Sequence, residues 1–174
     1  MTRMLPPFLL LVLALVALAC EPAGDAPNGP SPPTGYDVPF LGEAELKDEL
    51  DGLCTRARAT GRPLLIEFSA AWCSDCRRLH QMKQAPALAS ELAAWPRLVV
   101  NVGRFDRHRS LLAALGVESI AHWEILAPTH CAEPVAAWPS LAKRTLEVSS
   151  GAARHLSPED LAGWLAKFRL GDAD

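Results

Sequence analysis

Residues 63–83 constrain the fold most, because they join an apolar run to two closely spaced cysteines. The run from Leu64 to Phe68 follows the chain breaker Gly61, which predicts a buried strand. From Cys73 onward the chain is polar with apolar residues at helical spacing, which predicts a helix. The segment therefore predicts a strand, a short turn, the pair Cys73-x-x-Cys76 and a helix.

The position of the two cysteines favours redox chemistry. Cys73 stands where the helix would begin, and the unpaired backbone N–H groups of a helix start favour an anion. Because the thiolate is the reactive form of cysteine, we expect this position to activate Cys73. Cys76 follows one turn later, within reach of a disulfide. The pair therefore predicts a cycle between dithiol and disulfide by exchange with a partner.

The segment from Phe68 to Cys76, Phe-Ser-Ala-Ala-Trp-Cys-Ser-Asp-Cys, resembles the active-site segment of the thioredoxin superfamily. The Trp72–Cys73 junction after a predicted strand makes the resemblance more specific than a bare Cys-x-x-Cys. The resemblance covers residues 41–170 and implies an α/β thioredoxin-like fold, with a mixed four-stranded sheet flanked by helices. It implies exchange with protein thiols and disulfides and with an upstream redox partner, without an organic cofactor or a metal.

The resemblance also assigns roles to neighbouring residues. Glu67 stands six residues before Cys73, where the family has a buried acid that relays a proton to and from the resolving cysteine. Strand alternation leaves open the alternative that Glu67 reaches the edge of the sheet. Trp72, Ser74 and Asp75 neighbour the reactive sulfur, and the charge of Asp75 would oppose a thiolate.

The chain departs from the family pattern at Ala121. The family has a cis-proline there, just before the third strand and facing the cysteine pair, whereas this chain has Ile120-Ala121. Because a cis bond before a residue other than proline costs about 3 kcal/mol, we expect a trans bond. In the family, the backbone at this position pairs with the substrate strand and keeps metals off the cysteines. The missing proline would therefore affect how partners are recognised and would favour metal binding.

Two other functions stay open at this stage. His80 completes a Cys-x-x-Cys-x-x-x-His pattern, so the same residues could serve a protein that handles copper or another metal. A structural zinc site needs four ligands, and the sequence has no second Cys-x-x-Cys. On the expected helix His80 would point away from Cys73, as a surface residue. The second alternative is a binding module that keeps the fold without catalysis.

The N-terminus predicts export. Arg3 precedes an apolar run over residues 8–19, which has the length of a signal peptide and is short for a membrane span. The run ends at Cys20 and resembles a bacterial lipoprotein signal, in which that cysteine becomes the lipidated first residue. Free secretion after cleavage at residue 19 and a retained anchor are the alternatives. We expect the domain in the bacterial cell envelope, on the periplasmic or outer side of a membrane and held there by lipid.

Composition supports one domain behind a tether. Residues 20–40 are rich in proline and glycine, which predicts a flexible tether, and residues 41–174 would form the thioredoxin-like domain. The 174-residue chain has a net charge of −3 with its basic residues scattered along the sequence, so nothing indicates nucleic acid, and we expect a monomer.

Four cysteines remain once Cys20 is set aside, and an oxidising compartment permits disulfides. Local spacing favours Cys73 with Cys76, which leaves Cys54 and Cys131 either paired or as free thiols.

Hydrophobic periodicity and breakers predict the remaining elements. The expected helices cover residues 41–59, 73–94 with an interruption at Pro86, 110–115, and a last one starting at the cap Ser157; the expected strands cover residues 64–68, 97–102, 122–126 and 144–148.

Overall fold

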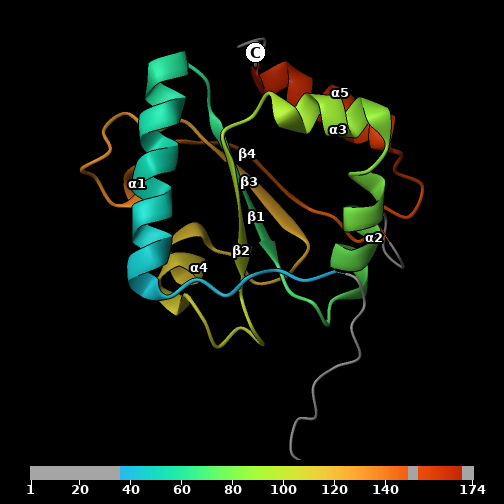
Figure 1. Cartoon of the computed structure of the whole chain (residues 1–174), viewed down its shortest axis with the longest axis horizontal. Coiled ribbons are helices and arrows are strands. Elements are labelled where there is room, and N and C mark those ends of the chain that lie inside the picture. The colour runs from blue at the N-terminus through green and yellow to red at the C-terminus, as the bar shows by residue number, and fades with distance from the viewer. Residues whose placement is uncertain (1–35, 149–152, 170–174) are drawn as a thin grey trace, which may run out of the picture. The chain divides into compact units, whose positions relative to one another are not determined.

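The computed structural model describes residues 36–148 and 153–169 (Figure 1). Its elements, in chain order, are α1 (Glu43–Thr60), β1 (Leu64–Ser69), α2 (Ser74–Met82), α3 (Pro86–Ala93), β2 (Arg97–Asn101), α4 (Arg109–Leu115), β3 (His122–Leu126), the 3₁₀ helix η2 (Val135–Ala137), β4 (Ser140–Thr145) and α5 (Pro158–Arg169). The predicted signal peptide, residues 1–19, and the predicted lipidation site Cys20 lie outside the described residues. Within the part that is described, none of the helices is both long and apolar enough to cross a bilayer.

The four strands form one mixed sheet in the order β2-β1-β3-β4. β1 pairs in parallel with β2 and antiparallel with β3, and β3 pairs antiparallel with β4. β1 is therefore central, which agrees with the burial of all six of its residues. The predicted mixed four-stranded sheet flanked by helices is confirmed.

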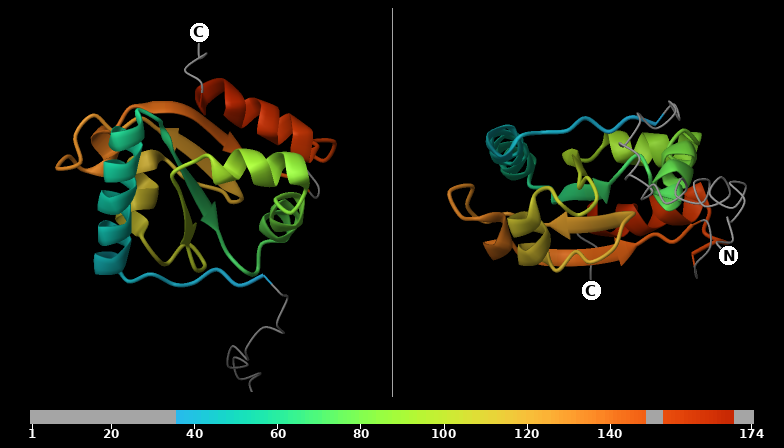
Figure 2. Two further views of the ribbon diagram at one scale, coloured as in Figure 1. Left: turned by 45° about the horizontal axis from the view of Figure 1, so that its top comes forward. Right: turned by 90° about the horizontal axis from the view of Figure 1, so that it is seen from below.

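Helices cover both faces of the sheet (Figure 2). Ile66 and Phe68 of β1 pack with α1 and α4 on one face. Leu65 of β1 and Trp123 of β3 pack with α2, α3 and α5 on the other. Alternate residues of β1 thus supply both cores, as the period of two of a strand requires.

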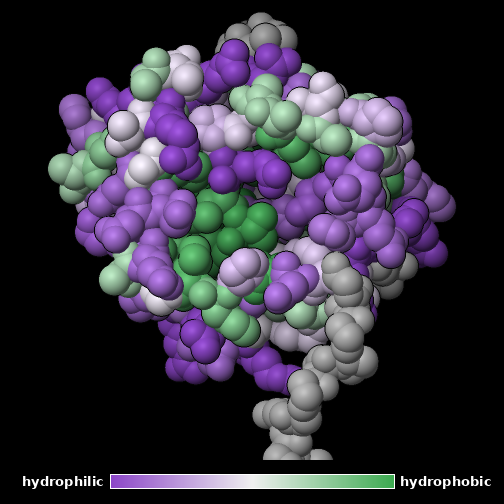
Figure 3. Space-filling model, in the orientation of Figure 1, coloured by the Kyte–Doolittle hydropathy of each residue, from purple (hydrophilic) through white to green (hydrophobic). Residues whose placement is uncertain are grey.

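β2 is an edge strand of the sheet. Figure 3 shows apolar surface gathered over β2, between α1 and α2, in the midst of a mostly hydrophilic face. Leu98 and Val99 of β2 are partly buried and pack against the two cores.

The predicted helix signals are confirmed at two places. The long helix expected after Cys73 is interrupted before Pro86: α2 ends at Met82, and Pro86 is the first residue of α3. At α5 the Ser157 hydroxyl accepts a hydrogen bond from the Asp160 backbone at 3.0 Å, and the Asp160 carboxylate accepts one from the Ser157 backbone at 2.9 Å. This reciprocal pair satisfies N–H groups at the start of α5.

The prediction for the fourth strand is wrong by four residues at its start. The apolar residues Leu146 and Val148 suggested residues 144–148, whereas β4 runs from Ser140 to Thr145. Pairing with β3 fixes the strand, with Leu126 opposite Ser140 and His122 opposite Thr145. Leu146 and Val148 are buried beyond the end of β4. The polar composition of β4 suits an edge strand whose outer side is exposed.

The prediction of a tether as far as residue 40 is wrong for its last part. Residues 36–40 are described, and two of them, Tyr36 and Val38, are buried against the domain. The Asn101 side chain donates a hydrogen bond to the Val38 carbonyl at 2.6 Å. Alternating apolar side chains and a backbone partner fix this segment in place, so the packed domain includes residues 36–40 as well as the residues from 41 onward.

Candidate active site

Cys73 and Cys76 form a disulfide at the start of α2, with their Cα atoms 5.2 Å apart. Cys73 is the N-cap of α2, and its sulfur accepts a hydrogen bond from the Cys76 backbone N–H at 3.1 Å. The exposed fraction is 5% for Cys73 and 0% for Cys76, so all of the accessible surface of the pair belongs to Cys73. The two cysteines thus differ both in exposure and in their place on the helix.

Ala121 packs in the same buried cluster as both cysteines. The expectation of a trans bond before it is wrong, because the Ile120–Ala121 peptide bond is cis. Tertiary contacts surround this bond: Ala121 is fully buried, and its carbonyl accepts a hydrogen bond from the Leu146 backbone at 2.7 Å. The chain therefore has a cis peptide bond close to the cysteine pair, although position 121 is an alanine rather than a proline.

Trp72 directly precedes Cys73 in the sequence, and 47% of its surface is accessible. Its indole N–H donates to the Gly103 carbonyl at 2.7 Å, and its ring faces Phe105 at 6.4 Å. Gly103 has a φ of 59°, and a side chain there would clash with Asp106. Glycine is therefore needed for the turn that holds Trp72.

Glu67 points from β1 into the core on the face of α2 and is 3% exposed. Lys83, which caps the C-terminus of α2, places Nζ 2.8 Å from both carboxylate oxygens. The Trp123 indole N–H donates to the same carboxylate at 3.1 Å. The alternative that Glu67 reaches the sheet edge is wrong, because β1 is a central strand.

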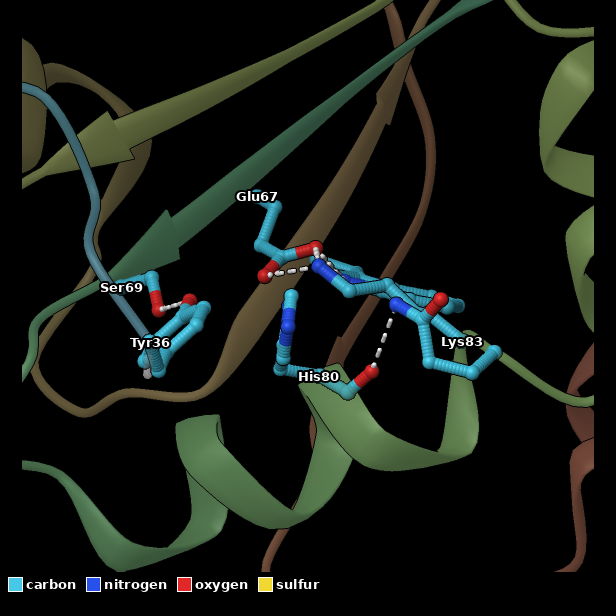
Figure 4. A network of polar contacts seen from close by, with 7 residues as sticks. Tyr36, Glu67, Ser69, His80 and Lys83 are labelled. Carbon is cyan, nitrogen blue, oxygen red and sulfur yellow. Dashed lines mark hydrogen bonds and ion pairs between the residues drawn. The ribbon is translucent and has the colours of Figure 1, made fainter. Parts of the chain in front are cut away.

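Tyr36 lies against this group from the N-terminal segment (Figure 4). Its hydroxyl shares a 2.5 Å hydrogen bond with the Ser69 hydroxyl, and its ring packs on His80 with centroids 4.7 Å apart. The pKa of Tyr36 is raised to about 12, first by burial and then by the Glu67 carboxylate, while the hydrogen bond to Ser69 acts in the opposite direction. The charge of Glu67 therefore acts on Tyr36 directly.

The other predicted neighbours lie at the surface of α2. Ser74 is exposed, and Asp75 is half-buried in the first turn, where an acid suits the helix dipole. His80 is also half-buried but faces Tyr36, so it is not the free surface residue that we expected. Across residues 36–148 and 153–169, no group of three or more His, Cys, Asp or Glu side chains is arranged to hold a metal ion.

Cys54 and Cys131 form a second disulfide, with Cα atoms 5.6 Å apart. It joins the buried side of α1 to the loop before β4, across 77 residues of sequence. This bond belongs to the core of α1 and α4 rather than to the core that contains Cys73.

Sequence reasoning missed three side chains of the site. Tyr36 lies within the stretch predicted to be a tether, and the sequence marks neither Trp123 nor Lys83 as part of the site. For Tyr36 the sequence does contain a signal: Tyr36 and Val38 are apolar residues two positions apart, a spacing typical of an extended segment that packs one side against a core. Lys83 carried no comparable signal, because its contact with Glu67 depends on where α2 ends.

Comparison with known proteins agrees with this geometry. No protein-family model matches the chain. A thioredoxin H-type from Oryza sativa subsp. indica is 30% identical over 74 residues, which are 42% of this chain and 57% of that protein, so the chain spans less than two thirds of this relative.

Solved structures match over more of the chain. A disulphide isomerase from Xylella fastidiosa Temecula1 superposes with a TM-score of 0.58 at 21% identity, over 76% of this chain and 97% of that one. The reduced C-terminal domain of Neisseria meningitidis DsbD gives 0.55 at 16% identity, over 75% of this chain and all of that one. The fold is therefore an α/β thioredoxin-like fold, with a Cys-x-x-Cys disulfide at the start of its second helix.

Proposed function

We propose that the protein is a thiol–disulfide oxidoreductase that exchanges disulfides with protein partners through Cys73 and Cys76. The observation that carries the proposal is the asymmetric disulfide at the N-terminus of α2. Cys73 is the slightly exposed N-cap whose sulfur accepts a backbone N–H, while Cys76 is fully buried behind it. A thiolate at Cys73 would keep that hydrogen bond and gain from the helix dipole.

The exchange takes two balanced steps. The Cys73 thiolate attacks one sulfur of a partner disulfide, and the other partner sulfur leaves as a thiolate. The Cys76 thiolate then attacks the Cys73 sulfur, which closes the Cys73–Cys76 bond and releases the second partner thiolate. The partner gains two electrons and the protein loses two; the reverse sequence oxidises a dithiol partner. An upstream redox partner would restore the starting state.

Glu67 is the proton carrier in this proposal. Cys76 must lose a proton before it attacks and regain one in the reverse direction, and it has no access to solvent. Glu67 is a buried carboxylate six residues before Cys73, the position at which the thioredoxin resemblance implies a proton-relaying acid. Lys83 and Trp123 would hold the carboxylate in place. They are positioning residues.

We further propose that the domain works in the bacterial cell envelope, held by a lipid on Cys20. This rests on the residues before Tyr36: an apolar run of signal-peptide length, a cysteine at its end and a proline-rich tether. Two of the proteins with similar folds are bacterial, a disulphide isomerase and a DsbD domain. The second disulfide, Cys54–Cys131, suits an oxidising compartment.

The experiment that tests the proposal is trapping. The Cys76→Ser variant cannot complete the second step, so it should accumulate mixed disulfides through Cys73 that dithiothreitol releases. The Cys73→Ser variant is the matched control and should trap nothing. If the Cys76→Ser variant also captures no partner, while the reduced wild-type protein binds Cu(I) or Zn(II) tightly in a defined ratio, the metal-handling function replaces the proposal. If Cys73→Ser leaves the cellular role intact, the domain is a binding module.

A further inference from the structure

Two adjoining pockets lie at the end of the sheet opposite the cysteine pair. The first, of about 430 Å³, lies between the ends of α1 and α3 and is lined by Arg56, Arg62 and Arg97. The second, of about 480 Å³, lies between the ends of α1 and α5 and is lined by Arg58, Arg62 and Arg169. We call these five arginines the arginine pole.

The arginine pole is assembled by the fold rather than by a basic stretch of sequence. Its members come from the last two turns of α1, the loop after it, the first residue of β2 and the last residue of α5. The acidic residues of α1 lie in the half nearer its start: Glu43, Glu45, Asp48, Glu49 and Asp51. Five of the chain's 17 lysines and arginines, which look scattered along a sequence of net charge −3, are therefore gathered at one end of the domain.

Structural partners account for only part of this charge. Arg169 pairs with Glu91 at 2.7 Å, and Arg62 donates to the Ala94 carbonyl at the end of α3 at 3.2 Å. Three helices end here, each contributing about half a negative charge. Counted over the described residues alone and with Glu91 included, roughly two to three positive charges are left over. Among the described residues that line the two pockets, none is an aspartate or a glutamate.

The second pocket adds an apolar wall. Pro63, Pro128, Leu141 and Phe168 line it beside the arginines, and Leu141 is 42% exposed, one of three large apolar side chains that are exposed among the described residues. A guanidinium fork matches the two oxygens of a phosphate or carboxylate, and the wall suits an attached apolar portion.

We propose that the arginine pole binds a phosphate-class oxyanion, with Arg62 shared between the two pockets as its central ligand. The oxyanion can be free or can be the headgroup of an anionic phospholipid, and the apolar wall accommodates the start of an acyl chain. The site lies at the opposite end of β1 from Cys73, so a bound ligand leaves the cysteine pair accessible. The proposal does not depend on the redox function.

The test uses the full chain in two arms. In the first, inorganic phosphate is titrated at constant ionic strength while the Nε–H signals of the arginines are followed by NMR. In the second, sedimentation measures binding to phosphatidylglycerol vesicles and to phosphatidylcholine vesicles. The apolar residues 8–19 can bind either lipid by themselves, so the readout is the difference in binding between the two kinds of vesicle. The variants are Arg62→Gln and, as a matched control, Arg109→Gln, which removes an exposed arginine outside both pockets.

We expect saturable binding that Arg62→Gln weakens roughly tenfold, because a hydrogen-bonded charge pair is lost, and that Arg109→Gln leaves unchanged. Binding in the phosphate arm identifies a free anion, and preference for phosphatidylglycerol alone identifies a headgroup; both support the proposal. No saturable binding in either arm, or equal binding by Arg62→Gln and wild type, overturns it. Binding that appears only after Asp172 and Asp174 are changed to asparagine also overturns it, because the chain's own acids would then be the occupants. Far-UV circular dichroism shows whether each variant is folded.

Discussion

The Nζ atom of Lys83 lies 2.8 Å from each carboxylate oxygen of Glu67, in an ion pair whose side chains are 10% and 4% exposed. The lysine belongs to the end of α2 and the glutamate to β1, so the pair joins the helix that carries Cys73 to the centre of the sheet. Removing one partner from a buried pair leaves the other charge without compensation.

We therefore predict that Lys83→Met lowers the free energy of unfolding by about 3–5 kcal/mol in urea denaturation. The double variant Glu67→Leu/Lys83→Met removes both charges and should recover most of that loss. Lys47→Met, which breaks the exposed pair with Asp51, is the control and should have no measurable effect. Equal losses for the single and double Lys83 variants would show that the ion pair is not the cause.

Tyr36→Phe tests whether the N-terminal segment belongs to the domain. The change removes the hydrogen bond between Tyr36 and Ser69, which is 0% exposed, and leaves the Ser69 hydroxyl without this partner. We expect a loss of about 1–2 kcal/mol in the free energy of unfolding. In the double variant with Ser69→Ala, the loss should be smaller than the sum of the single losses. Strict additivity would mean that the two hydroxyls do not interact.

The raised pKa of Tyr36 predicts an alkaline effect on stability. The unfolded chain releases this proton near pH 10 and the folded chain near pH 12, so the unfolded state binds fewer protons in between. Stability contributed by Tyr36 is therefore present below pH 10 and falls as pH rises towards 12. Lysines also titrate between pH 10 and pH 12. The measurement is therefore the midpoint of urea unfolding of the wild type minus that of Tyr36→Phe, followed across this pH range. A difference that does not change with pH would contradict the prediction.

The Cys54–Cys131 disulfide should serve stability rather than exchange. It closes 77 residues of sequence, so replacing both cysteines with alanine should lower the free energy of unfolding by about 2–5 kcal/mol without reductant. The rate at which the reduced Cys73–Cys76 pair reduces a protein disulfide should not change, because the bond lies in the other core. A large fall in that rate, with the fold intact, would instead give this disulfide a part in the reaction.

Much of the fold could be predicted because its signals are local. The strand ending before Trp72, the interruption at Pro86 and the cap at Ser157 each depend on a few adjacent residues. β4 could not be placed this way, because pairing with β3 sets its register and its polar residues resemble a loop.

The site could be predicted only in part, for a similar reason. Cys73, Cys76 and Glu67 are tied together by short spacings along one segment. Lys83 and Trp123 meet Glu67 through tertiary packing, and Tyr36 reaches it from 31 positions upstream of Glu67. The cis bond before Ala121 could not be predicted, because the local sequence lacks the proline that favours such a bond.

The central claim is that the start of α2 makes the Cys73 thiol acidic. The direct measurement is the rate at which iodoacetamide alkylates Cys73 in the reduced protein across a pH series. Mass spectrometry identifies the modified residue, and the Cys76→Ser variant leaves Cys73 as the single thiol of the pair. The account predicts a Cys73 pKa clearly below the value of about 8.5 for a free cysteine. A rate profile no different from that of free cysteine would contradict it.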